Sequence, residues 1–238
     1  MFKPIPTTAL PEQYTNIQPT NCKFINIIND DMLDVKMQYP LQNLKCAVKD
    51  CYIRLDIYEK LLTAQALLPD GYKLRIWDAW RPFTLQQELY EKYYKDIVNT
   101  FDLSKLPLHK QQSIVSNYIS YPEDNRMYPP LHTTGGAVDV TLLDLYNNEV
   151  EMGTAFDDFS PKARTDYFEE NPIDIKLRKN RRILYNCMTR AGFVNLPSEW
   201  WHYSYGDRVW AYYNSTPALY SGVYSTEELI NKNDTADL

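Results

Sequence analysis

The sequence predicts an α+β fold, and two patterns of different period carry that prediction. Apolar residues recur at helical spacing near 52–68 and near 83–98. Residues 72–77 alternate as a strand does, and the β-branched run 136–142 is typical of a buried strand. No repeat, linker or low-complexity tract divides the chain. Residues 1–238 are therefore predicted to form a single domain.

Local signals predict the other elements. Pro69-Asp70-Gly71 should end the first helix, and Pro82 should begin the second. Gly192 is placed to end a later helix in the left-handed conformation. The remaining predicted elements are a strand over 22–28, a short helix over 108–118, a helix over 172–190, and short antiparallel strands over 199–203 and 209–213.

The two ends and the cysteines complete the outline. Residues 1–20 are rich in Pro and Thr and should lie as an extended arm over the surface, while the polar tail 226–238 should fray or form a short helix. No apolar stretch has the length of a signal peptide or a membrane span. The 4 cysteines are irregularly spaced; Cys46 and Cys51 could approach each other, but separate buried thiols are expected. We therefore expect a cytoplasmic protein.

The charge balance argues against nucleic acid as a partner. The chain has 25 basic and 31 acidic residues, a net charge of −6, whereas neutralising phosphates requires a basic face. The longest basic cluster, 176–182, falls on a predicted helix and is expected to be a solvated helix face. A small-molecule partner, with no membrane contact, is the expectation.

One pair of candidate metal ligands lies in the segment His132-Thr-Thr-Gly-Gly-Ala-Val-Asp139. Catalytic zinc takes three nitrogen or oxygen ligands and keeps one position open. A separation of seven residues would place the two side chains on opposite faces of a straight strand. Gly135 and Gly136, in a chain with only 7 glycines, can bend the backbone. His132 would then lie in the incoming turn, and Asp139 would point inward from the strand.

The segment Glu199-Trp-Trp-His202 supplies a second carboxylate and a second imidazole. On a strand, this spacing aims the two side chains differently, so His202 would reach the metal and Glu199 the attacking water. The chain has 3 histidines, and the third, His109, is expected to lie outside the site. Each ligand histidine could instead be a hydrogen-bonded structural residue. Trp200 and Trp201 are expected to pack in the core.

These motifs resemble those of the zinc D,D-peptidase superfamily and, within it, of the D-alanyl-D-alanine dipeptidases. The resemblance rests first on His132-x-x-Gly-x-Ala-x-Asp139 and Glu199-x-x-His202. Residues 72–82, 152–157 and 182–193 match as well, and the resemblance runs from about residue 22 to 215. It implies a hedgehog-like fold, with a small central antiparallel sheet flanked by helices.

The resemblance implies a zinc dipeptidase that hydrolyses D-alanyl-D-alanine. His132, Asp139 and His202 would bind one Zn²⁺ per chain, and Glu199 would act as general base and then as general acid. Relatives also suggest a small homo-oligomer. Two alternatives stay open: a D,D-carboxypeptidase of the same superfamily, which the missing export signal disfavours, and an inactive zinc-binding protein, which would not need Glu199 or Arg81.

Two further residues take roles from the resemblance. Arg81 would stabilise the negative oxygen of the tetrahedral intermediate, a role suited to a planar, permanently charged donor. Asp157 would pair with the amino group of the dipeptide and exclude longer N-extended peptides. Arg81 could instead form a salt bridge at a helix entry, and Asp157 could cap a turn. Pro130 stands where the family often carries serine, which leaves open how the substrate carboxylate is held.

Overall fold

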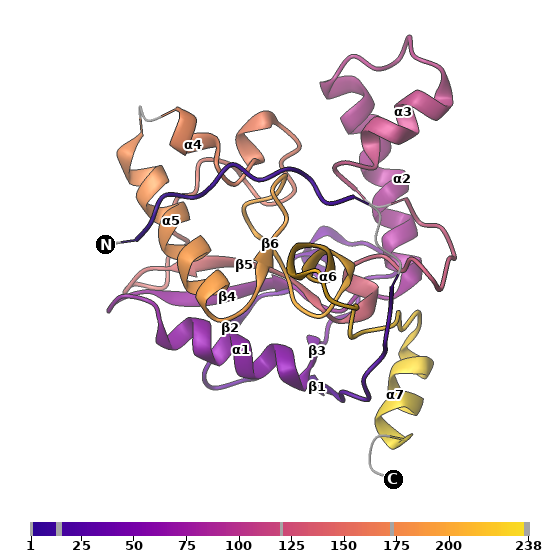
Figure 1. Ribbon diagram of the computed structural model, residues 1–238, viewed down its shortest axis with the longest axis horizontal. Helices are drawn as coiled ribbons and strands as arrows, with labels where there is room; N and C mark the ends of the chain where they lie inside the picture. The colour runs from indigo at the N-terminus through magenta and orange to yellow at the C-terminus, as the bar shows by residue number, and fades with distance from the viewer. Residues whose placement is uncertain (1, 13–15, 120, 172–173, 236–238) are drawn as a thin grey trace.

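A five-stranded sheet in the spatial order β2-β4-β5-β7-β6 forms the centre of the protein (Figure 1). The computed structural model describes residues 2–12, 16–119, 121–171 and 174–235. The strands are β2 (Asp34–Val35), β4 (Lys73–Asp78), β5 (Ala137–Leu143), β6 (Val194–Asn195) and β7 (His202–Ser204). All neighbours pair antiparallel except β2 and β4, which are parallel. The predicted α+β class, with a small and mainly antiparallel sheet, is confirmed.

The middle strand β5 aligns three polar residues across the sheet. All seven residues of β5 are buried, so both faces of the sheet are covered at this strand. Its pairing with β4 matches Ile76 with Val140 and, after an irregularity, Asp78 with Asp139. On the other side, Asp139 pairs with His202 of β7. Asp78, Asp139 and His202 therefore form a row across three adjacent strands.

A second, two-stranded sheet leads into the first helix. β1 (Phe24–Asn26) pairs antiparallel with β3 (Tyr52–Arg54), and α1 (Leu55–Ala66) follows β3 without a break. The helix predicted from residue 52 thus begins three residues later, because residues 52–54 are used in strand pairing. Ile57, Leu61 and Ala64 form the buried face of α1, as the helical spacing predicted.

Helices α2 (Phe83–Thr100) and α3 (Leu108–Val115) form a projecting lobe (Figure 1, magenta). α2 begins directly after Pro82, whose fixed φ suits a helix entry. Its inner face carries Leu89, Tyr93 and Ile97, which pack with Tyr39 of the 3₁₀ turn η1 (Tyr39–Gln42). α3 is three residues shorter than predicted.

Helix α5 (Ile175–Arg190) packs against α1 and contradicts one prediction. The predicted start, residues 172–173, lies outside the described residues, and Asp174 caps the helix. Gly192, with φ +101°, ends it as predicted. The basic cluster 176–182 was expected to be solvated, but Arg181 is 2% exposed and donates to three backbone carbonyls, those of Met152, Lys162 and Arg164. These three carbonyl oxygens take the place of water around the Arg181 guanidinium.

The C-terminal part differs from the predicted pair of strands. Residues 209–213 lie in α6 (Arg208–Asn214), because the Asp207 carboxylate accepts hydrogen bonds from the N–H groups of Val209 and Trp210. The strand predicted over 199–203 is shorter, since β7 begins only at His202. The tail forms α7 (Thr226–Thr235), and residues 236–238 lie outside the described residues. The other short elements are η2 (His132–Thr134), η3 (Pro161–Ala163) and α4 (Tyr167–Glu170).

The N-terminal arm crosses the surface and is anchored at several places along its length (Figure 1, indigo), among them Lys3 to Asn186 and Ile5 to Glu169. The Ala9 carbonyl accepts a hydrogen bond from the Tyr213 hydroxyl at 2.5 Å, and Ile17 forms a bridge with Ala218. No helix or strand forms in the described residues of 2–20. The single-domain interpretation stays a prediction.

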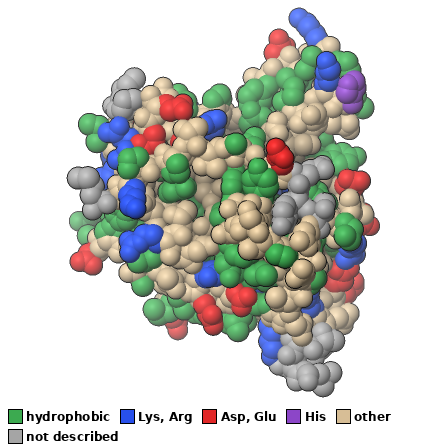
Figure 2. All heavy atoms as spheres, in the orientation of Figure 1, with side chains coloured by type: hydrophobic (Ala, Val, Ile, Leu, Met, Phe, Trp, Pro, Cys, Tyr) green, Lys and Arg blue, Asp and Glu red, His purple; other side chains and the backbone are tan. Residues whose placement is uncertain are grey.

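Charged side chains of both signs are interspersed on the face drawn in Figure 2. Among the described helices, none combines the length and the apolar character that a membrane crossing requires. All four cysteines are free; Cys51 and Cys187 are buried as expected, whereas Cys22 and Cys46 are half-buried.

Candidate active site

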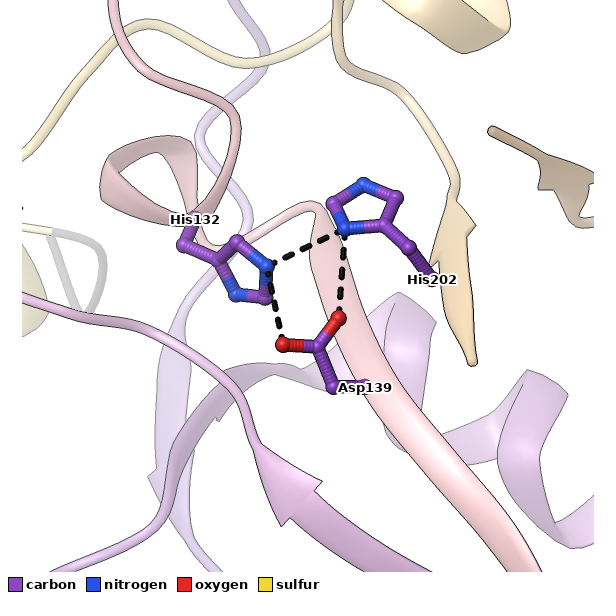
Figure 3. Close-up of side chains that lie close together, drawn as sticks. All are labelled: His132, Asp139 and His202. Carbon is purple, nitrogen blue, oxygen red and sulfur yellow. Dashed lines mark hydrogen bonds and ion pairs between the residues drawn. The ribbon is translucent and has the colours of Figure 1, made fainter. Parts of the chain in front are cut away.

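Three side chains from three elements converge at one end of the sheet (Figure 3). His132 comes from η2, Asp139 from β5 and His202 from β7. One ligand atom from each lies within 4.8 Å of the others. The Nε2 atom of His132 lies 3.2 Å from Nδ1 of His202, and the Asp139 carboxylate oxygens lie 3.4 Å and 3.2 Å from these two nitrogens.

Two glycines create the turn that brings His132 beside Asp139. Gly135 ends η2 with φ +70°, a left-handed conformation that side chains disfavour. A Cβ atom on Gly135 would lie 2.3 Å from the Phe24 ring, and one on Gly136 would lie 2.6 Å from the Tyr205 carbonyl oxygen. Neither position can accept a side chain without displacing its neighbours. The predicted bend between the two candidate ligands is confirmed.

The second histidine is brought in by strand pairing. Asp139 and His202 are directly opposite in the antiparallel β5–β7 ladder, so their side chains stand on the same face, about 5 Å apart at Cβ. Trp200 and Trp201, which precede β7, are 1% and 2% exposed. Their predicted packing in the core is confirmed, and it fixes the approach of the chain to His202.

Hydrogen bonds on the far side of each ring fix which nitrogen faces the cluster. The Nδ1 atom of His132 donates to the Ala79 carbonyl at 2.7 Å, so its bare Nε2 faces the cluster. The Nε2 atom of His202 lies 3.3 Å from the Ser204 hydroxyl, which leaves Nδ1 facing inward. Such outer hydrogen bonds orient metal-ligating imidazoles.

The donor set fits a divalent cation. Two imidazole nitrogens face the Asp139 carboxylate, and Oδ1 of Asp139 accepts no hydrogen bond from the described residues. The three side chains are between 2% and 5% exposed. Burial raises the pKa of Asp139, but the imidazoles of His132 and His202 outweigh that effect and lower it overall. Two nitrogens and one carboxylate, all buried, form the three-ligand set typical of catalytic zinc.

Glu199 lies beside this cluster. Its Oε2 atom is 3.6 Å from Nδ1 of His202. It stands in the turn before β7, not on the strand as predicted, and this turn aims its side chain into the same pocket. Burial, followed by the negative charges of Asp139 and Asp157, raises the pKa of Glu199 well above its usual range. A carboxyl group with a raised pKa is suited to taking up and returning a proton near neutral pH.

Arg81 borders the cluster from the end of β4. Its Nη2 atom lies 3.6 Å from Oδ2 of Asp139. The guanidinium also donates to Asp78 and, from Nη1, to Gln86 at 2.9 Å. The salt bridge to Asp78, 2.8 Å at its shortest, matches the structural alternative considered for Arg81. Arg81 therefore forms a salt bridge at the helix entry and also lies beside the candidate ligands.

Sequence reasoning missed Asp78, which connects Arg81 to His132. The Oδ2 atom of Asp78 lies 2.9 Å from Nε of Arg81 and 3.1 Å from Nδ1 of His132. Asp78 is 1% exposed, and its burial raises its pKa while Arg81 and His132 lower it. Its place two residues before Trp80, inside the segment 72–82 that resembles the family, was the available signal in the sequence.

Asp157 faces the same pocket from a strained turn. The Tyr93 hydroxyl donates to Oδ2 at 2.9 Å, and the Tyr39 hydroxyl lies 3.4 Å from Oδ1. Its φ of +57° is uncommon for a residue other than glycine. Burial and the nearby Asp139 charge raise the pKa of Asp157 to about 7, although Arg81 and the Tyr93 hydrogen bond lower it. The sequence showed Tyr93 only as part of a buried helix face.

One pocket, with a volume of about 170 Å³, is lined by all six predicted site residues. They are His132, Asp139, His202, Glu199, Arg81 and Asp157. Leu10, Pro11 and Glu12 of the N-terminal arm also line it. This cavity is smaller than the roughly 300 Å³ at which sites for drug-sized ligands begin. The third histidine, His109, is exposed on α3 and is absent from the pocket lining, as expected.

Comparison with known proteins identifies the family. The sequence profile of the D-ala-D-ala dipeptidase family matches residues 42–221. The chain belongs to this family. A D-alanyl-D-alanine dipeptidase from Synechocystis is 32% identical over 176 residues, 67% of this chain and 71% of that relative. A D-alanyl-D-alanine dipeptidase from Escherichia coli is 36% identical over 72 residues, which are 30% of this chain and 36% of that relative.

Membership in the D-ala-D-ala dipeptidase family makes the protein a zinc metallopeptidase. The candidate ligands and Glu199 all fall within the matched range 42–221, as do Arg81 and Asp157. The individual roles of these residues stay predictions.

Proposed function

We propose that this protein hydrolyses D-alanyl-D-alanine to two molecules of D-alanine. The observation that carries the proposal is the buried cluster of His132, Asp139 and His202 with Glu199 beside it, in a chain of the D-ala-D-ala dipeptidase family. We propose one zinc ion per chain, held by these two imidazoles and the Asp139 carboxylate. When bound, zinc would polarise the scissile carbonyl and acidify a water molecule.

The chain's own residues would supply the proton transfers. Glu199, with its raised pKa, would take a proton from the attacking water and deliver it to the amine of the departing D-alanine. Arg81 would donate hydrogen bonds to the oxygen that becomes negative in the tetrahedral intermediate. Asp78 would hold the Arg81 guanidinium in place, since it accepts from both Nε and Nη2 of that residue. One water is consumed, and one peptide bond is broken.

Substrate selection would begin at Asp157. In the free protein its carboxylate accepts a hydrogen bond from the Tyr93 hydroxyl. The ammonium group of a dipeptide would form a direct ion pair with this carboxylate, which has none in the described part of the chain, and a peptide extended at its N-terminus would have no such group. A small pocket with an amine-selective wall favours a dipeptidase over a carboxypeptidase that acts on longer wall peptides.

We further propose that the enzyme acts in the cytoplasm, as a small homo-oligomer. The four free thiols are consistent with a reducing compartment. Hydrolysis of this dipeptide would there deplete a cell-wall precursor or return D-alanine to the cell.

The experiment that tests the function is a panel of alanyl-alanine dipeptides of L,L, L,D and D,D configuration, with and without a chelator. Cleavage restricted to the D,D dipeptide and abolished by chelation is the expected result. A D-Ala-D-Ala-terminated pentapeptide extends the panel. Release of D-alanine from the pentapeptide but not from the dipeptide would point to a carboxypeptidase, and no cleavage at all would point to an inactive binding protein.

A further inference from the structure

The pocket contains an arginine that forms no ion pair with any carboxylate in the described part of the chain. Two arginines line the pocket, Arg81 and Arg208. The Arg81 guanidinium is occupied by Asp78 and Gln86. Arg208 forms no ion pair with a described residue; it contacts a tyrosine ring and one backbone carbonyl, and its charge acts on the neighbouring buried Asp207, where it helps to lower a pKa that burial raises. A half-buried, permanently charged guanidinium in a substrate pocket is available to bind an anion.

Arg208 is fixed in a geometry that leaves part of its donor fork free. The guanidinium stacks over the Tyr128 ring, 4.1 Å from its centroid, and Nη1 donates to the Pro129 carbonyl at 2.5 Å. The backbone is held as well, because Asp207 caps α6 at this point. Within the described residues, Nε and Nη2 of Arg208 have no hydrogen-bond acceptor. Those two donors match the spacing of a carboxylate.

Arg208 and Asp157 belong to different walls of the pocket. Val209, the neighbour of Arg208, packs in a small hydrophobic cluster with Leu131. Tyr39 and Tyr93, the hydrogen-bond partners of Asp157, pack in a separate cluster built on α2. One cavity of about 170 Å³ therefore has the Asp157 carboxylate on one wall and the Arg208 guanidinium on another. This arrangement matches a small zwitterion with an ammonium group at one end and a carboxylate at the other.

We propose that Arg208 binds the C-terminal carboxylate of the dipeptide substrate, an inference that rests on the proposed function. Pro130 stands where the family often carries serine, and it offers neither an N–H group nor a side-chain donor to a substrate carboxylate. It directly follows Pro129, whose carbonyl Arg208 contacts. Arg208 supplies both the charge and the donors. With Asp157 at the other end, the two charges define the length of the substrate and select a free dipeptide.

The test compares D-alanyl-D-alanine with its C-terminal amide, which lacks the carboxylate charge. Binding of both is measured by calorimetry in zinc-loaded Glu199→Gln protein, and again after Arg208→Gln is added. Arg126→Gln is the matched control, because Arg126 also stacks on a tyrosine, Tyr224, but does not line the pocket. Thermal unfolding of each variant checks that it is folded. Turnover by the unmutated enzyme is measured separately and tests the proposed function alone.

The expected result is that Arg208→Gln weakens binding of the acid about 10- to 100-fold, the range for a charge-assisted hydrogen-bonded pair. Binding of the amide should change less than about threefold, so the preference for the acid is lost. An acid-to-amide preference that survives in Arg208→Gln would overturn the role of Arg208 even if the unmutated enzyme turns over the dipeptide. Failure of the acid to bind the parent protein, or equal binding of acid and amide there, would overturn it as well, whereas absent turnover with normal binding of the acid would reject only the hydrolytic function.

Discussion

The substitution Asp157→Asn should stabilise the metal-free protein at high pH. Burial and the nearby Asp139 carboxylate raise the pKa of Asp157 to about 7, from an ordinary value of 3.8. This rise in pKa corresponds to a loss of ~4 kcal/mol in the free energy of unfolding if the carboxylate is fully shielded from solvent. Because the Asp157 side chain borders the pocket, solvent screens part of this penalty, and we expect ~2 kcal/mol. Asparagine keeps an acceptor for Tyr93 and tolerates the φ of +57°.

The sign of the pH dependence follows from proton binding. Between about pH 4 and 7 the folded protein retains a proton on Asp157 that the unfolded chain has released. The stability contribution of this group therefore falls as pH rises through that interval and stays low above it. The asparagine variant lacks this loss, so the difference in stability between the two proteins should be smaller at pH 5 than at pH 9.

The same substitution should damage substrate binding. Without the carboxylate, the ammonium group loses its partner, and KM for D-alanyl-D-alanine should rise about 10- to 100-fold. In the unmutated enzyme KM should rise as the pH falls far enough to protonate Asp157, whose pKa burial raises. That dependence should be absent in the variant.

Urea unfolding of the metal-free proteins at pH 5 and pH 9, together with steady-state kinetics of the zinc-loaded proteins, provides the assay. Asp158→Asn is the matched control: its Oδ1 accepts from the Ser160 N–H at 2.7 Å, and it does not line the pocket. An Asp157→Asn protein that is no more stable than the parent at pH 9, with an unchanged KM, would refute the assignment of a strained, charged amine-binding group.

Three further predictions concern the centre of the site. Glu199→Ala should bind zinc stoichiometrically yet lose at least about 10²- to 10⁴-fold in kcat, measured by D-alanine release and metal analysis; comparable turnover would remove Glu199 from the mechanism. His202→Ala should fail to retain zinc, whereas the control His109→Ala should keep both metal and activity; stoichiometric metal in the first variant would reject the ligand assignment. Arg81→Lys should lower kcat by about 10²- to 10³-fold with a smaller change in KM, because lysine keeps the charge but loses the planar fork held by Asp78; an unchanged kcat would argue for a structural role only.

Much of the fold could be predicted because its long elements have strong local patterns. The helical spacing that includes Leu61 predicted α1, and the spacing that includes Leu89 predicted α2, to within a few residues. The candidate ligands could be found for a related reason, since the scarce Gly135-Gly136 pair marks the bend between His132 and Asp139. Local sequence is informative where the backbone has few alternatives.

Other features were missed because they depend on the tertiary structure. The residues 209–213 are rich in aromatic and branched side chains, which favoured a strand, but the capping carboxylate of Asp207 starts a helix there. Arg181 has the sequence context of a surface residue and is buried only because distant carbonyls surround it. Tyr39 and Asp157 are 118 residues apart, so no spacing in the sequence could bring them together.

The direct pairing of Asp139 with His202 makes the metal site sensitive to how β5 and β7 are aligned. Side chains alternate between the two faces of a strand, so a slip of one residue would turn one candidate ligand away from the other. Zinc retention would then report on strand alignment as well as on ligand identity. A refolded sample containing slipped molecules would hold less than its full complement of metal while keeping nearly the same secondary structure, and a zinc titration would count the correctly aligned fraction.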